Sequence, residues 1–210
     1  MTMHNHEPGE PLEGADVRLP ALQSVADPAP LGLAAFAMTT FALSLMNANI
    51  WPAAIFPALA LALVYGGFAQ LLAGMWEFVR KNTFGALAFT SYWAFWISYY
   101  VFVKFLVGAL KPALVPSAAG VFLLGWTIFT FYMLIASMRV SGAVVAVFFV
   151  LTITFVLLTI GAFNSNSTIT HIGGWAGIVT AALAWYASAA GVINETFKKA
   201  LVPVFPLAPR

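Results

Sequence analysis

The sequence contains no cysteine and very little charge. Without cysteine it can form no disulfide, thiolate nucleophile, iron–sulfur cluster or cysteine-based zinc site. Only 8% of its 210 residues are charged, against about 25% in ordinary globular chains. After Asp27 the only acidic residues are Glu77 and Glu195. So few charges cannot keep a protein surface hydrated, and we therefore expect the body of the chain to lie in a lipid bilayer.

Motifs of enzymes and of nucleic-acid-binding proteins are also missing. The sequence has no His-Glu-x-x-His zinc motif, no Gly-x-Ser-x-Gly nucleophile motif and no glycine-rich phosphate loop. Its basic residues are few and scattered, unlike the clustered basic patches that bind DNA or RNA. We therefore predict a protein that is not an enzyme, has no cofactor, metal site or nucleic-acid partner, and moves or binds something in a membrane.

Three regions of the chain differ in composition. Residues 1–26 combine proline, glycine and acidic residues with little apolar material, which predicts a disordered polar tail. They lack the basic start and apolar core of a secretory signal peptide, so we expect no cleavage. Residues 27–200 form the predicted transmembrane domain, and residues 201–210 form a short C-terminal tail.

The long apolar stretches predict six transmembrane helices. A spanning helix needs about 20 mainly apolar residues, and breaks that contain polar residues or proline separate six such stretches. The expected spans are 31–50, 53–77, 84–107, 118–138, 142–163 and 172–193. The fold class is therefore all-α, a polytopic membrane protein.

Basic residues are distributed unevenly between the two sides of the membrane. With six spans both termini lie on one side, and that side would also hold most of the basic residues: Arg18, Arg80, Lys81, Arg139, Lys198, Lys199 and Arg210. Lys104 and Lys111 would lie on the other side. Because cytoplasmic loops carry an excess of lysine and arginine, we expect both termini to face the cytoplasm from the plasma or inner membrane.

One face of the first span carries polar side chains. Phe36, Thr40, Ser44 and Asn47 follow at intervals that place them on one side of a helix. Such a stripe can serve helix packing, because serine and threonine bond back to the carbonyl group four residues earlier. We favour a water-filled lumen, because an amide deep in the membrane, such as that of Asn47, needs polar partners.

The second span places Gln70 and Glu77 on one face. Two interpretations of Glu77 stay open. It can pair with Arg80 or Lys81, three and four residues later, at the cytoplasmic end of the helix. Alternatively it couples transport to protons, since ionisable groups inside membranes are usually functional.

The sixth span carries a face of small residues, for which we favour helix packing, because small side chains let two backbones approach closely. That face comprises Gly173, Gly177, Thr180, Ala184 and Ser188.

Several short motifs between residues 27 and 205 occur together in one known family. They are Asp27-Pro28-Ala29-Pro30-Leu31-Gly32-Leu33 with the following residues 34–40, then Tyr65-Gly66-Gly67-Phe68-Ala69-Gln70, Gly74, Glu77, Asn82-Thr83-Phe84-Gly85, residues 88–92 and 148–152, His171-Ile172-Gly173-Gly174-Trp175 and Asn194-Glu195. In these motifs the chain resembles the acetate uptake transporter family, which includes bacterial succinate–acetate permeases and fungal acetate and ammonia-export proteins.

The resemblance implies a fold, a cargo and a constriction. Each protomer would enclose its own central pathway between six helices, and the protomers would assemble as a homo-hexamer. The cargo would be acetate and related short carboxylates, with succinate in some members. The hydrophobic constriction of the family falls on Phe36, Tyr92 and Leu151, and Ala184 matches a small-residue position that influences which carboxylate passes.

This constriction suggests how a carboxylate would cross. Entering a low-dielectric region is costly for an anion, so an apolar ring favours the protonated acid or an anion that enters with a proton. The Tyr92 hydroxyl group would remain available for a cargo oxygen. On either side of the ring, polar side chains would replace water around the cargo: Thr40, Ser44, Asn47 and Gln70.

One position departs from the family pattern, because Asp27 stands where the family usually has asparagine. Aspartate caps a helix as well as asparagine does, and its charge suits the positive end of the helix. Pro28 would take the first helical position, and the Ala29 N–H would donate to the Asp27 side chain. If the asparagine amide contacts the cargo, an ionised aspartate cannot replace it.

Two other functions stay open. One is that the chain is a passive channel for small neutral solutes such as ammonia, urea or amides. Alternatively it would transport nothing and act as a membrane sensor or scaffold through its N-terminal tail.

Overall fold

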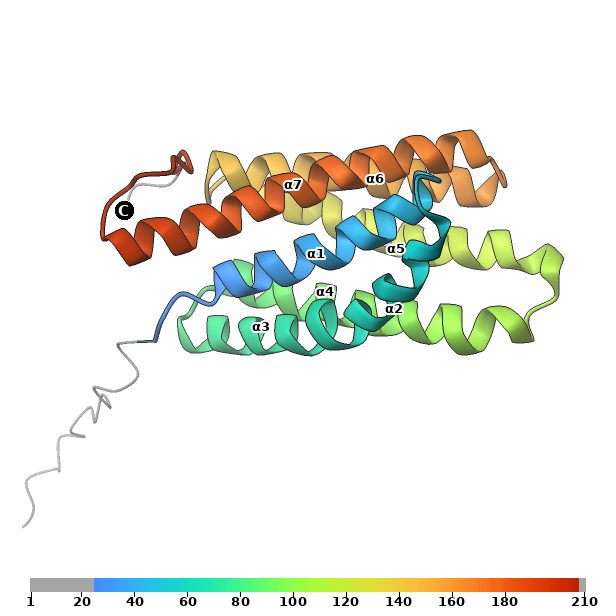
Figure 1. Ribbon diagram of the computed structural model, residues 1–210, viewed down its shortest axis with the longest axis horizontal. Coiled ribbons are helices and arrows are strands. Elements are labelled where there is room, and N and C mark those ends of the chain that lie inside the picture. The colour runs from blue at the N-terminus through green and yellow to red at the C-terminus, as the bar shows by residue number, and fades with distance from the viewer. Residues whose placement is uncertain (1–24, 208–210) are drawn as a thin grey trace, which may run out of the picture.

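The computed structural model describes residues 25–207 (Figure 1). The predicted disordered tail lies almost entirely outside these described residues, and so do Arg18 and Arg210. The division into a membrane domain and two tails stays a prediction.

Six helices long and apolar enough to cross a membrane lie within the described residues, as the sequence predicts. The first span is α1 (Ala29–Asn47), and the second, Pro52–Val79, joins α2 (Ile55–Leu63), a π-helical segment (Val64–Ala69) and α3 (Gln70–Val79). The third span, Thr83–Ala109, contains α4 (Thr83–Val101) and a second π-helical segment (Phe102–Leu106). The remaining spans contain α5 (Val115–Ser137), α6 (Gly142–Phe163) and α7 (Ser167–Phe197).

The last helix is longer at both ends than the predicted span 172–193. Asn166 caps it, because its side-chain oxygen accepts the N–H of Ile169 at 3.1 Å, and the Thr170 hydroxyl group donates to the Asn166 carbonyl group at 3.1 Å. Residues 167–170, which the sequence predicts to lie between two spans, therefore form the first turn of α7. The helix ends at Lys198, whose φ of 51° is left-handed.

The helices form an elongated bundle with both described chain ends at one end (Figure 1). α1 packs along α7, α7 along α6, and α6 along α5, while α3 packs against α4 and α1. The segment 25–28 and the turns 80–82 and 138–141 share the end that holds the described chain ends, which we call the terminal end.

Glycines set the close approach of α7 to its neighbours. A methyl group added to Gly177 would lie 2.2 Å from Ser44 Oγ, and one added to Gly174 would lie 2.2 Å from the backbone nitrogen of Ala48. A methyl group on Gly173 would lie 2.9 Å from the Leu158 side chain of α6. The packing interpretation of the small-residue face is thus confirmed for Gly173 and Gly177, as expected where no hydrophobic effect drives helices together.

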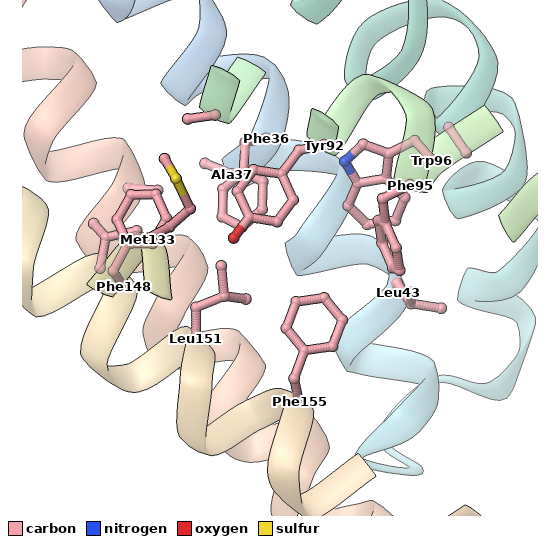
Figure 2. Close-up of a cluster of buried hydrophobic side chains, with 14 of the residues drawn as sticks. Phe36, Ala37, Leu43, Tyr92, Phe95, Trp96, Met133, Phe148, Leu151 and Phe155 are labelled. Atoms are coloured by element: carbon pink, nitrogen blue, oxygen red, sulfur yellow. The ribbon is translucent and has the colours of Figure 1, made fainter. Parts of the chain in front are cut away.

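Aromatic rings fill the space between α4 and α5. Phe95 of α4 packs against Trp126 of α5 with ring centroids 5.3 Å apart, and against Phe122 at 5.7 Å. Phe155 of α6 meets Phe95 edge-on at 5.4 Å (Figure 2). Each such aromatic pair contributes about 0.5–1.5 kcal/mol beyond the area that it buries. These contacts join α4 to α5 and to α6 in the interior of the bundle.

Residues 201–207, which the sequence assigns to a tail, fold back on the terminal end, and we call them the C-terminal strap. The Gly142 N–H, at the start of α6, donates to the Phe205 carbonyl group at 2.8 Å. The Tyr186 hydroxyl group donates to the Pro203 carbonyl group at 2.6 Å. Asn194 accepts two strap N–H groups and donates to the Val202 carbonyl group, at 2.8–2.9 Å. The strap thereby ties α7 to the turn before α6.

Candidate functional site

Three helices bring the predicted constriction together. Phe36 of α1, Tyr92 of α4 and Leu151 of α6 are all at most 5% exposed. The Phe36 and Tyr92 ring centroids are 5.3 Å apart, and Leu151 points toward both rings (Figure 2). The structure therefore places these three side chains at one level of the bundle interior, where they form an apolar ring.

The Tyr92 hydroxyl group already has a partner. It lies 3.0 Å from the hydroxyl group of Thr130 on α5, a residue that is fully buried. Sequence reasoning left this hydroxyl group free for the cargo and did not single out Thr130. Thr127 and Thr130 are polar residues three positions apart in the apolar middle of α5, and that spacing is the signal that would have found it.

A cavity of about 90 Å³ adjoins the constriction. Ala29, Asn82 and Val140, which line it, lie at the terminal end of the bundle, whereas Phe36 and Tyr92 belong to the ring. The cavity thus extends from the terminal end toward the ring. Further apolar residues complete the lining: Leu33, Phe84, Gly85, Ala88, Phe89, Val144, Val147, Phe148 and Leu151.

Gln70 and Glu77 supply the polar side chains of α3 in this cavity, and both are fully buried. Neither the amide nitrogen nor the amide oxygen of Gln70 has a hydrogen-bond partner among residues 25–207. The same is true of Glu77 Oε1 within the described part of the chain. Unpartnered buried polar atoms are rare in folded proteins and call for water or a ligand. The shared face predicted for these two residues is therefore the cavity face.

Glu77 is held by Asn82, in the turn between α3 and α4, and not by a basic residue. The Asn82 side-chain nitrogen donates to Glu77 Oε2 at 2.9 Å, and the Asn82 oxygen accepts the Gly85 N–H at 3.2 Å. Among the described residues Arg80 pairs with Asp27 instead. The interpretation that Glu77 pairs with Arg80 or Lys81 is wrong, because its carboxyl group turns into the bundle while Arg80 reaches across to the start of α1.

Asp27 makes the predicted bond to the Ala29 N–H but does not occupy the predicted capping position, and it also forms an ion pair. Its Oδ1 accepts the Ala29 N–H at 3.1 Å, as expected, although α1 begins at Ala29 and Pro28 takes the capping position. Sequence reasoning missed its partner Arg80, which lies 53 residues away in the chain. The pair joins the start of α1 to the end of α3.

Two other residues of the signature pack helices together. A methyl group on Gly32 would lie 2.5 Å from the Phe89 ring of α4. The Ser188 hydroxyl group of α7 donates to the Pro30 carbonyl group at 2.6 Å. Residues 30 and 32 therefore position the start of α1 between α7 and α4.

Four predicted pathway residues lie away from this cavity. Thr40 is buried, Ser44 packs against Gly177, and Ala184 is fully buried in the same hydrophobic cluster as the constriction. Asn47 lines a separate hollow of about 420 Å³ at the opposite end of the bundle, together with His171. The residues on this face of α1 thus do not line one continuous cavity in this structure. The transport roles of these four residues stay predictions.

No group of three histidine, aspartate or glutamate side chains in the region 25–207 is placed to hold a metal ion.

Comparison with known proteins places the chain among membrane transport proteins. The model of the GPR1/FUN34/yaaH family matches residues 12–209. The Succinate-acetate/proton symporter SatP of Escherichia coli is 38% identical over 180 residues, which cover 86% of this chain and 95% of SatP. The Ammonia transport outward protein 2 of Saccharomyces cerevisiae is 39% identical over 190 residues, and the match spans 66% of its length, slightly less than two thirds.

A solved structure has the same fold. The bacterial acetate channel SatP superimposes with a TM-score of 0.81 at 38% sequence identity, and the match covers 86% of this chain and 99% of that one. The six-helix arrangement and the membrane setting described above are therefore those of a known transport protein.

Proposed function

The chain belongs to the GPR1/FUN34/yaaH family, and on this basis we propose that it transports acetate and related short carboxylates across a membrane. One observation carries the proposal. A buried apolar ring of Phe36, Tyr92 and Leu151 adjoins a cavity that contains unpartnered polar groups. The ring opposes a hydrated anion, while the cavity offers hydrogen bonds to a cargo that has lost its water. Transport is proton-linked or channel-like, and the protein is not an enzyme.

The size of the cavity supports a small cargo. A volume of about 90 Å³ is several times the roughly 10–15 Å³ that holds one water molecule. The cavity therefore has room for a cargo of a few non-hydrogen atoms. Ala184, buried in the cluster that includes the ring, would narrow the path further if a larger side chain replaced it, which supports its proposed role in selectivity.

Charge placement supports a cytoplasmic location for both termini. Arg80, Lys81, Arg139, Lys198 and Lys199 belong to turns and helix ends at the terminal end of the bundle. Lys104 and Lys111 lie near the opposite end. The positive-inside rule then orients the terminal end toward the cytoplasm of the plasma or inner membrane. Cysteine labelling at introduced sites near residues 25 and 111 tests this orientation.

Assembly is the remaining part of the proposal. We propose the homo-hexamer that the family resemblance implies, with membrane lipid around it. Mass spectrometry of the protein released intact from detergent micelles measures the number of protomers directly.

A second cargo has one observation in its favour, the similarity to a yeast protein named for outward ammonia transport. Ammonia is small and neutral, so an apolar ring would oppose it less than it opposes a carboxylate anion.

Flux measurements in liposomes test both functions. Labelled acetate is followed with and without an inward proton gradient, and then in competition with propionate and succinate. Accumulation above the level in empty liposomes that a protonophore abolishes indicates proton-coupled transport, whereas faster equilibration to the same final level as in empty liposomes under the same gradient indicates a channel. If no acetate flux depends on the protein, the carboxylate function is refuted and ammonia becomes the cargo to test.

A further inference from the structure

Glu77 lines the cavity through which the cargo would pass, and one of its carboxyl oxygens has no partner among the described residues. Its Oε2 is occupied by the Asn82 side chain at 2.9 Å, and its Oε1 has no partner among residues 25–207. We propose that Glu77 exchanges a proton with the cargo carboxylate at Oε1, and that Gln70, two helical turns away, receives the cargo as the neutral acid. This inference rests on the transport function proposed above.

The two free groups of Gln70 match a neutral carboxylic acid. Its amide nitrogen donates and its amide oxygen accepts hydrogen bonds, and neither has a partner in the described part of the chain. A protonated acid offers one acceptor and one donor, so it satisfies both. An ionised carboxylate has only acceptors and would leave the amide oxygen without a partner. Gln70, beside the ring, therefore favours the protonated form.

Glu77 lies where the protonation state of the cargo must change. It is two helical turns from Gln70 on α3, roughly 10 Å along the helix axis, and it shares the cavity with residues of the terminal end. Two carboxylates enclosed in this small cavity would repel each other strongly in a low dielectric. One shared proton removes that repulsion, as it does in other enclosed carboxylate pairs.

The surroundings of Glu77 leave proton exchange as its available chemistry. The charged groups that act on it are Asp27 and Arg80, and these two pair with each other. Asn82 fixes one carboxyl oxygen, while a methyl group on Gly85 would lie 2.7 Å from the Glu77 carboxyl carbon. The carboxyl group is thus placed tightly, and Oε1 is the one of its oxygens that no described group occupies.

The step balances with one proton for each carboxylate. A neutral acid that has crossed the ring loses its O–H bond, and a new O–H bond forms at Glu77 Oε1. The cargo then leaves as an anion at the terminal end, and Glu77 releases the proton to water there. In the opposite direction each step reverses, so protonated Glu77 converts an entering anion into the acid that Gln70 binds.

Glu77→Gln tests the proposal, with Glu195→Gln as its matched control. The first change keeps the size of the side chain and its bond with Asn82 but removes the exchangeable acid proton. Glu195 is exposed, pairs with Lys198, and does not line the cavity. Liposome flux is measured at neutral pH for acetate and for acetamide, which has a similar shape but no carboxyl proton to exchange. We expect Glu77→Gln to lower the ratio of acetate to acetamide flux by about tenfold or more and Glu195→Gln to leave it unchanged.

Infrared difference spectroscopy supplies a readout that does not depend on flux. Adding isotope-labelled acetate should change the carbonyl band of a protein carboxyl group in the wild type and in Glu195→Gln, but not in Glu77→Gln. An unchanged flux ratio in Glu77→Gln, or no acetate-induced band change in the wild type, overturns the proton-exchange role while the transport function stands. Wild-type protein that carries no acetate overturns both.

Discussion

The bond between Tyr92 and Thr130 leads to a test of how the constriction meets its cargo. The two hydroxyl oxygens lie 3.0 Å apart and belong to α4 and α5. If the Tyr92 hydroxyl group contacts the cargo and Thr130 orients it, Tyr92→Phe and Thr130→Val should act through the same group. The loss of acetate flux in the double variant should then equal the loss in Tyr92→Phe alone.

The expected sizes follow from the kinds of bond removed. A neutral hydrogen bond to the cargo contributes about 1 kcal/mol, so Tyr92→Phe should lower acetate flux about fivefold. Bonds between side chains of neighbouring membrane helices average about 0.6 kcal/mol, so Thr130→Val should lower it about threefold. Thr127→Val is the matched control on α5, because Thr127 bonds to Thr159 at 2.9 Å and touches neither the ring nor the cavity.

Initial rates of labelled acetate uptake into liposomes are measured for the wild type and the four variants, and thermal unfolding in detergent shows whether each variant still folds. Flux losses in the double variant that multiply those of the two single variants would refute the shared-group reasoning. Equal flux in Tyr92→Phe and wild type would show that the hydroxyl group serves only to join α4 and α5.

Three further changes test the packing around the site. Gly174→Ala places a methyl group against the backbone at the end of α1 and should lower the free energy of unfolding by about 1–3 kcal/mol. Its unfolding temperature should therefore be lower than that of Gly125→Ala, where the added methyl group meets no atom of another element within 4 Å. Asp27→Asn keeps an acceptor for the Ala29 N–H but removes a half-exposed ion pair with Arg80, so the free energy of unfolding in detergent should fall by about 0.2–1 kcal/mol; a larger fall would mean that the pair is screened from solvent. Asn194→Ala removes the hydrogen bonds that hold the C-terminal strap, and limited proteolysis should cut the strap faster than in wild type; an unchanged rate would show that the strap is held elsewhere.

Hydrophobic pattern predicted the membrane-spanning helices well, because an apolar stretch of sufficient length has few alternatives in lipid. The helix ends were less predictable. The polar stretch before the last span looked like a loop, yet Asn166 caps α7 there. Side-chain capping depends on backbone geometry that composition does not reveal.

Some features of the candidate site could likewise be predicted from the sequence, and others could not. The face shared by Gln70 and Glu77 follows from spacing along one helix, and the structure places both on the cavity. The partners that complete the site are remote in sequence: Thr130 for Tyr92 and Arg80 for Asp27. Such pairs depend on which helices are neighbours, and a single sequence does not determine that order. The stripe on α1 is less informative, because a regular spacing does not distinguish a lumen from helix packing, and in the structure Ser44 packs against Gly177.

The π-helical segment Val64–Ala69 explains how one span serves both packing and pathway. In α2 the buried residues are Ala58 and Ala62, whereas in α3 they include Gln70 and Glu77. At about 100° of rotation per residue, a regular helix that buries Ala62 would direct position 69 inward. The wider π turn inserts one extra residue and directs Gln70 inward instead.

Gly67 makes the wider turn feasible. A methyl group at this position would lie 2.5 Å from the Ala62 carbonyl oxygen, so a larger residue would force the backbone to shift. Because α3 is regular from Gln70 to Val79, the rotation set at the π turn carries through to Glu77. The alignment of both polar groups with the cavity therefore depends on a backbone irregularity ten residues before the carboxyl group that it positions.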